Sequence, residues 1–116
     1  MSLPPLRKRA RSGIDRGVSR EWPRHRAFIR KHACCVPGCE DGPIEVAHVR
    51  HASNAGVGVK PFDWSAVSLC RSHHSEQHNV GVETFQKRHL INLDSLAAEF
   101  TARSPDVAMK EAMKNV

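Results

Sequence analysis

Cysteine and histidine side chains are concentrated in two short segments whose spacing suits metal binding. Residues 34–39 read CCVPGC, and the Pro-Gly pair predicts a tight turn that brings two thiols together. Residues 70–73 read CRSH, a Cys-x2-His pair. Because two ligand pairs on separate turns can surround one ion tetrahedrally, we expect a structural zinc ion here rather than unpaired buried cysteines. The expected ligands are Cys35, Cys39, Cys70 and His73, with Cys34 as the alternative to Cys35.

The composition also favours metal binding over disulfide bonding. The chain has 116 residues, enough for one small domain, and only 5% are aromatic, so its apolar core needs further support. No N-terminal run resembles a signal peptide and no stretch is long enough to cross a membrane, which predicts an intracellular, cytoplasmic protein. In a reducing compartment, clustered cysteines bind metal more often than they form disulfides. A redox role for Cys35 and Cys39 is less favoured, because three residues separate them and a third cysteine lies far along the chain.

A second set of histidines lies close to the expected zinc ligands. Residues 44–49 (IEVAHV) alternate in polarity as a strand does, which places His48 near the end of that strand. His74 and His78 are four residues apart and share one face of a predicted helix, whereas His73 points about 100° away from His74. A structural zinc site has no need of these further histidines. A nuclease does need a general base and a metal ion beside the phosphate that it hydrolyses.

Flanking segments are expected to hold these histidines and cysteines in place. Residues 19–33 predict a short helix, with Ser19 as a possible cap and Pro23 in the first turn. Residues 82–103 predict further helix, in which Asp94 is a possible cap for a second segment. The expected organisation is a basic arm without regular structure (1–18), one zinc domain (19–103) and a weakly amphipathic C-terminal tail (104–116).

The positive charge of the chain is concentrated near its N-terminus. The formal net charge is +6, but residues 1–33 contain ten Lys and Arg against only Asp15 and Glu21. Residues 34–116 contain eight Lys and Arg against ten acidic residues. A basic arm of this kind suits a polyanion, most simply nucleic acid, although a solvated tail without a partner is the simpler alternative.

Three motifs together resemble the HNH endonuclease superfamily. Residues 47–51 (AHVRH), 58–63 (GVKPFD) and 69–78 (LCRSHHSEQH) carry the resemblance, which covers about residues 30–100. More narrowly, they are similar to the HNH-like zinc proteins of phages and prophages, some of which are linked to recombination. The resemblance implies an α+β fold, in which a small ββα-metal core, a β-hairpin followed by a helix, carries a structural zinc site and flanking helices. It also implies metal-dependent hydrolysis of DNA phosphodiesters.

The resemblance also implies roles for individual residues. His48 would be the general base, and His74 would bind the catalytic ion, Mg²⁺ or another divalent cation. His78 would be a second ligand of that ion or a phosphate contact. The residues expected to contact nucleic acid are Arg50, His51 and Lys60, with an ordinary surface position as the alternative for His51.

Two positions depart from the pattern of the superfamily. Many members carry an acidic metal ligand directly before the base, where this chain has Ala47. The middle Asn has no direct counterpart, and Asp63 and Ser65 are the candidates. Asp63 could orient His48, reach the metal or simply cap a turn. The alternative functions are therefore a non-catalytic zinc-binding DNA module that acts as an accessory recombination factor, and an RNA-binding or protein-docking zinc domain.

Overall fold

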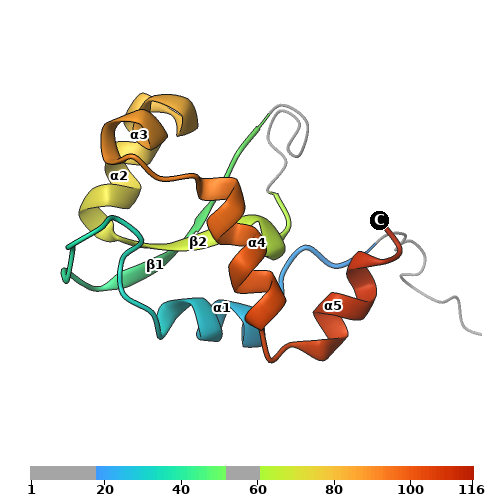
Figure 1. The fold of residues 1–116 in the computed structure, drawn as a ribbon. Coiled ribbons are helices and arrows are strands. Elements are labelled where there is room, and N and C mark those ends of the chain that lie inside the picture. The colour runs from blue at the N-terminus through green and yellow to red at the C-terminus, as the bar shows by residue number, and fades with distance from the viewer. Residues whose placement is uncertain (1–17, 52–60) are drawn as a thin grey trace, which may run out of the picture.

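The computed structural model describes residues 18–51 and 61–116. Most of the predicted basic arm and the predicted nucleic-acid contact Lys60 lie outside these described residues. Within them, the chain forms two strands, one 3-10 turn and five α-helices (Figure 1). In chain order these are α1 (Pro23–Arg30), β1 (Ile44–His48), η2 (Asp63–Ser65), β2 (Ala66–Cys70), α2 (Arg71–Val80), α3 (Val82–His89), α4 (Leu93–Arg103) and α5 (Val107–Met113).

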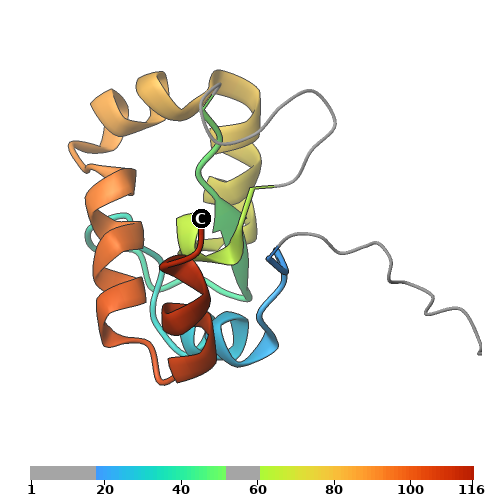
Figure 2. The same cartoon turned by 90° about the vertical axis from the view of Figure 1, so that its right-hand side faces the viewer.

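A β-hairpin followed directly by a helix forms the centre of the fold. β1 pairs with β2 in antiparallel register, so that Ile44 lies opposite Cys70 and His48 opposite Ala66. Cys70 ends β2 and also caps α2, because its Sγ accepts the backbone N–H of His73 at 3.4 Å. The hairpin lies between α4 on one side and α2 on the other (Figure 2). This arrangement confirms the predicted α+β class with a ββα core.

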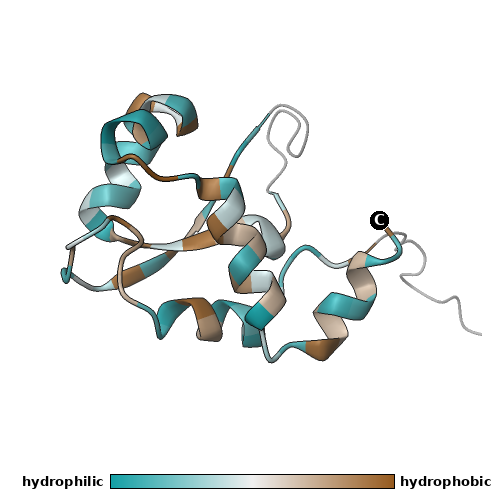
Figure 3. Cartoon of the chain, in the orientation of Figure 1, coloured by the Kyte–Doolittle hydropathy of each residue, from teal (hydrophilic) through white to brown (hydrophobic). Residues whose placement is uncertain are grey.

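The apolar core is built on β2, whose five residues are all buried. Val67 and Leu69 belong to one cluster with Phe85 of α3 and with Leu93 and Ala97 of α4. Ser68, the one polar residue of β2, is buried as well, and its Oγ donates to the carbonyl of Ala33 at 2.7 Å. β1 mixes hydrophobic and hydrophilic residues, whereas α2 is mostly hydrophilic (Figure 3).

Helix α2 has very little apolar surface with which to hold itself against the hairpin. Its only buried side chain is Gln77, whose Nε2 donates to the backbone carbonyl of His48 at 3.3 Å. Helices of small domains normally gain their stability from an apolar stripe against the core. The position of α2 therefore depends on its polar contacts and on the cysteine and histidine side chains at its start.

Two of the predicted helix caps need correction. α1 begins at Pro23 with Trp22 as its N-cap, and Ser19 instead accepts the backbone N–H of Glu21, so it does not cap the helix. The N-cap of α4 is Asn92, whose side chain accepts the N–H of Ser95 at 2.9 Å, so the predicted cap Asp94 lies in the first turn. A side chain at position 92 reaches the free N–H groups of the first turn, while position 94 already belongs to the helix.

The C-terminal tail contains helix α5 (Val107–Met113). Asp106 caps α5 by accepting the N–H of Met109 at 3.0 Å, and Met109 is fully buried. Just before it, Ser104 Oγ lies 2.7 Å from Nδ1 of the buried His25 on α1. The tail is therefore packed against the rest of the fold. Among the described helices, none has the length and apolar character needed to cross a membrane.

Candidate metal centre and active-site cavity

Four side chains from the turn after α1 and from the start of α2 converge on one point. Cys34, Cys39, Cys70 and His73, called the Cys3His cluster below, each offer a ligand atom within 4.8 Å of the others. Nδ1 of His73 lies 3.4 Å from Sγ of Cys34 and 3.3 Å from Sγ of Cys70. Sγ of Cys39 lies 3.9 Å from Sγ of Cys70.

These separations suit a tetrahedral ion. With Zn–S near 2.3 Å and Zn–N near 2.0 Å, the edges of a tetrahedron are about 3.8 Å between sulfurs and about 3.5 Å between sulfur and nitrogen. The observed distances are close to both values. The Cys3His cluster can therefore hold a metal ion such as zinc.

The predicted ligand Cys35 is replaced in this cluster by its neighbour Cys34. Cys34 is 7% exposed and faces His73, whereas Sγ of Cys35 lies 3.5 Å from Oγ of Ser68. The backbone N–H of Cys35 also donates to the carbonyl of Ser68, which ties this residue to β2. Consecutive residues in this irregular turn point in different directions, so only one of the two thiols reaches the cluster.

Burial disfavours the thiolate form of Cys34 in the Cys3His cluster. Burial is the largest influence on Cys34 and raises the pKa of its thiol to about 11. A divalent cation would reverse this preference, because thiolates are the ligand form and the cation supplies the missing positive charge. Without a cation the Cys34 thiol is therefore favoured in its neutral form, and a bound cation would favour the thiolate.

A second group of possible metal ligands lies beside His73, on the side of α3. Glu76 and His89 offer ligand atoms within 4.8 Å of an imidazole nitrogen of His73. Nε2 of His89 lies 3.0 Å and 3.1 Å from the two oxygens of Glu76, which also accepts a bond from Arg88 at 3.1 Å. Carboxylates beside metal-binding histidines commonly fix the orientation of the ring. His89 therefore links α3, through Glu76, to the surroundings of the cluster.

His48, the predicted general base, is held by a buried carboxylate. Its Nε2 lies 2.8 Å from Oδ1 of Asp63, and the Asp63 side chain is fully buried. An ionised carboxylate accepts a hydrogen bond, so Nε2 carries the proton and Nδ1 carries the lone pair. Of the three roles considered for Asp63, the structure supports orientation of His48.

Asp63 is itself fixed from the N-terminal side of the fold. Its Oδ2 accepts Nε–H of Arg26 at 2.7 Å and the backbone N–H of Trp22 at 2.6 Å. Burial would raise the pKa of Asp63, but the hydrogen bonds from His48, Arg26 and Trp22 outweigh it and hold the pKa at about 2. The carboxylate is therefore ionised at neutral pH and joins α1 to the end of β1.

His74 and His78 meet on one face of α2, as their spacing predicts. Their Nε2 atoms are 3.2 Å apart, and Nδ1 of His74 donates to Oε1 of Glu45 on β1 at 2.8 Å. This bond directs the lone pair of His74 toward His78. Partial burial lowers the pKa of His78, and His74 and Arg50 lower it further, which favours the neutral imidazole that can bind a cation.

Glu45 is the acidic residue that the sequence analysis missed. It lies two residues before Ala47, and alternate residues of a strand share a face, so the strand pattern contained the signal. Its carboxylate accepts bonds from His74 and Arg71, and these lower its pKa. Within residues 18–51 and 61–116, however, His74 and His78 form no group of three with another His, Cys, Asp or Glu ligand atom.

One cavity of about 380 Å³ contains the predicted base and two of the three histidines of α2, His74 and His78. This cavity, called the His48 cavity below, is formed by side chains of α1, β1 and α2 and by Arg50, two residues beyond the end of β1. Its lining residues are Arg26, Arg30, Ile44, Glu45, Val46, His48, Arg50, His74 and His78. Three arginines against one carboxylate give the cavity a positive lining.

Arg50 and His51, the predicted nucleic-acid contacts within the described residues, lie in different places. Arg50 is exposed and lines the His48 cavity. His51 instead pairs with Asp94, whose two oxygens each lie 3.1 Å from its Nε2. His51 thus joins the end of the hairpin to the first turn of α4, which agrees with the alternative of an ordinary surface position.

A family model described as "Putative HNHc nuclease" matches residues 17–99 of the chain. The chain belongs to the HNH nuclease superfamily. No curated protein and no solved structure matches it significantly. The family match covers the hairpin, the Cys3His cluster and α1, and it ends within α4.

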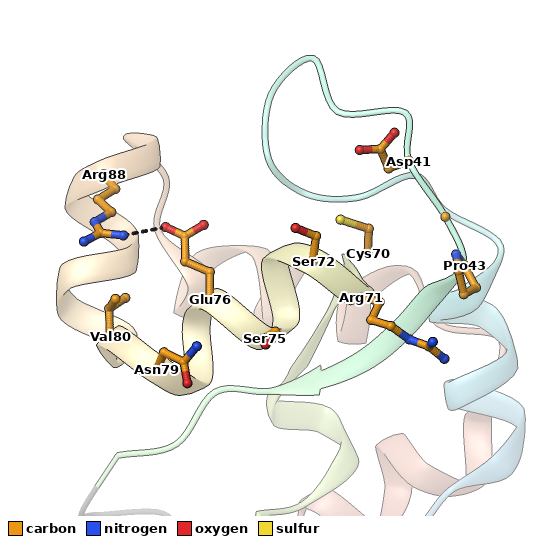
Figure 4. A pocket seen from close by; sticks show the side chains of 11 residues that line it. Asp41, Pro43, Cys70, Arg71, Ser72, Ser75, Glu76, Asn79, Val80 and Arg88 are labelled. Carbon is orange, nitrogen blue, oxygen red and sulfur yellow. Dashed lines mark hydrogen bonds and ion pairs between the residues drawn. The ribbon is translucent and has the colours of Figure 1, made fainter.

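In this HNH protein a second cavity is larger than the His48 cavity and contains none of its histidines. A groove of about 830 Å³ lies between α2, α3 and the loop before β1 (Figure 4). It is lined by serine, asparagine and charged side chains, among which Glu76 and Arg88 pair with each other. None of the described residues that line it is a histidine, so size alone does not identify the chemical centre of this HNH domain.

Proposed function

We propose that this HNH protein hydrolyses DNA phosphodiester bonds with a divalent metal ion. The observation that carries the proposal is the placement of His48, already oriented by buried Asp63, in the same cavity as His74 and His78. A hydrolase of phosphodiesters needs a base for water and positive charge for the phosphate, and this cavity provides groups suited to both.

In this proposal His48 accepts the proton of the attacking water on Nδ1. Asp63 keeps Nε2 protonated, holds the ring in one orientation and stabilises the imidazolium that forms. The hydrogen bonds of Asp63 to Arg26 and Trp22 keep the carboxylate in place during this proton transfer. His48 would then return to the neutral form by releasing its proton to solvent.

His74 and His78 are proposed to hold the catalytic cation, Mg²⁺ or another divalent ion. Glu45 orients His74 for this role through its bond to Nδ1. When bound, such an ion neutralises the charge of the phosphate and of the leaving oxygen. Because the described residues offer only these two protein ligands, water and substrate oxygens would complete its shell.

The Cys3His cluster is proposed to hold a structural zinc ion. All four of its donors come from the protein, which is the usual arrangement of a closed structural site. The cluster joins the loop after α1 to the first turn of α2. It thereby fixes the helix that presents His74 and His78.

A nicking assay tests the proposal. Supercoiled plasmid and branched DNA are incubated with the purified chain in Mg²⁺, in Mn²⁺ and without added ion. Metal-dependent nicking by the wild type is expected, and His48→Ala should slow it by about 10²–10⁴-fold. Nicking by pure His48→Ala at the wild-type rate would reject the assigned base.

A second candidate function is a zinc-binding DNA module without catalysis, serving as an accessory factor in recombination. Ala47 at the position of an expected acidic ligand, and the two-histidine set on α2, favour it. This alternative expects DNA binding but no metal-dependent cleavage of any DNA form. Absence of nicking by the wild type in every condition would therefore favour the module over the nuclease.

A further inference from the structure

We propose that helix α1 supplies a phosphate-binding site, in which Arg30 and the adjoining Arg26 bind one phosphodiester of the nucleic acid opposite His74 and His78. This inference rests on the proposed function, because it names how the substrate is held in the same cavity. It assigns a substrate-positioning role to a helix that lies outside the ββα core.

The first observation is that two arginines of α1 line one side of the His48 cavity. Arg26 and Arg30 are four residues apart, so they lie on the same face of the helix. Like charges at this spacing repel each other and weaken a helix slightly. A bound anion between the two guanidinium groups would remove that repulsion.

The second observation is how each arginine is engaged. Arg26 uses Nε to bond Asp63 at 2.7 Å, which fixes the guanidinium beside His48 while 21% of the side chain stays exposed. Its Nη2 is buried and has no hydrogen-bond partner among the described residues. Arg30 is exposed at the end of the helix and also lines the cavity. An anion in the cavity would therefore meet an Arg26 side chain that its bond to Asp63 already positions.

The third observation is the charge of the cavity. Arg50 adds a further positive charge at the end of β1, and Glu45 is the one carboxylate among the described residues that line the cavity. That carboxylate already accepts bonds from His74 and Arg71. Ionised Asp63, bonded to Arg26, offsets one further positive charge, so three arginines still outnumber the two carboxylates. A phosphodiester carries one negative charge with two oxygens that match the guanidinium fork.

The dinucleotide TpT tests this site, because it has a single phosphodiester and no terminal phosphate. The full chain, as purified, is titrated at constant ionic strength while the side-chain Nε–H signals of Arg26 and Arg30 are followed by NMR. Thymidine, which has the same base and sugar without phosphate, is the ligand control. We expect TpT to shift both arginine signals and thymidine to leave them unchanged.

The decisive variant is Arg30→Gln, with Arg24→Gln as its matched control. Both remove one positive charge from α1, but Arg24 does not line the cavity. Removal of a charge-assisted hydrogen bond should weaken TpT binding roughly tenfold in Arg30→Gln, with little change in Arg24→Gln. Arg26 is left intact in both variants because it also holds Asp63.

The outcomes separate this inference from the proposed nuclease activity. Equal weakening in the two variants, equal shifts with thymidine, or no shift of the arginine signals with TpT would overturn the phosphate site. Nicking without these shifts would leave the nuclease standing and reject the site on α1. Shifts that depend on Arg30 in a protein that does not nick DNA would support the site and count against catalysis.

Discussion

The Cys3His cluster and the His48 cavity share helix α2 but are built in opposite ways. The cluster gathers four protein donors, of which Cys34 is 7% and Cys70 is 1% exposed. The His48 cavity has about 380 Å³ of space, and its two imidazole nitrogens from His74 and His78, 3.2 Å apart, are the ligands proposed for a cation. A closed donor set suits a structural ion, while an open one leaves positions for water and substrate.

The comparison of the cluster with the cavity shows that histidines adjacent in sequence can belong to separate sites. His73 and His74 are neighbours in the chain, but His73 faces two thiols and His74 faces Glu45. Their side chains diverge because successive residues of a helix are rotated by about 100°. An ion that binds His73 also fixes the position of His74, because the two residues are neighbours on one helix turn. The structural metal site can therefore support the candidate catalytic site.

The largest expected effect is the loss of zinc and of folding when a ligand of the Cys3His cluster is removed. Cys70→Ser should abolish zinc binding and largely unfold the domain, because metal binding in small zinc domains contributes on the order of 10 kcal/mol to folding. α2 has little apolar surface to compensate for that loss. Elemental analysis of zinc and circular dichroism of the same sample measure the outcome.

Cys35→Ser is the matched control for this prediction. Cys35 lies in the same segment as Cys34 but bonds Ser68 and stays outside the cluster. This variant should keep one zinc per chain and remain folded. A loss of zinc in Cys35→Ser, together with its retention in Cys34→Ser, would show that the two thiols exchange roles.

A smaller effect, on the free energy of unfolding, is expected from replacing Asp63 beside the His48 cavity. Its pKa is about 2 in the folded chain against an ordinary value of 3.8, so its ionised form stabilises the fold by about 2 kcal/mol. A depressed pKa gives a contribution that is complete above about pH 4 and is lost as the pH falls toward 2. The difference in free energy of unfolding between wild type and Asp63→Asn should therefore shrink over that window.

Urea denaturation at several pH values measures this difference. Asp94→Asn is the control, because Asp94 is an exposed carboxylate whose pairing with His51 should contribute below about 1 kcal/mol. A gap between wild type and Asp63→Asn that stays constant from pH 6 to pH 2 would mean that the buried hydrogen bonds do not depress the pKa.

The smallest expected effect concerns the basic arm. Deleting residues 1–18 removes five Lys and Arg together with Asp15. DNA binding should weaken, and the plot of log affinity against log salt should flatten by about 0.9 for each phosphate that the shortened chain no longer neutralises. Fluorescence anisotropy across a salt series gives the slope, and an unchanged slope would show that the arm does not bind DNA.

Much of this site was predictable because its signals are local in sequence. The Cys-x2-His pair, the strand ending at His48 and the i, i+4 spacing of His74 and His78 each depend on neighbouring residues. They predict the hairpin, the helix and two separate histidine sets. The sequence did not decide whether Cys34 or Cys35 belongs to the cluster, because the answer depends on which side of an irregular turn faces β2.

The interactions that sequence reasoning missed join residues that are distant along the chain. Arg26 meets Asp63 across 37 residues, and Glu45 meets His74 across 29 residues. The C-terminal tail is held against α1 because Ser104 meets His25 across 79 residues. Tertiary packing decides such pairs, and no local pattern of charge or polarity specifies them.

The most direct test of the central claim is to measure nicking and zinc content together in His74→Ala. If one helix serves two independent sites, Mg²⁺-dependent nicking should fall at least about 100-fold while the chain keeps one zinc and its fold. Wild type and His32→Ala, in which an exposed histidine outside both sites is replaced, provide the references. Loss of zinc along with activity in His74→Ala, or nicking at the wild-type rate, would contradict the account.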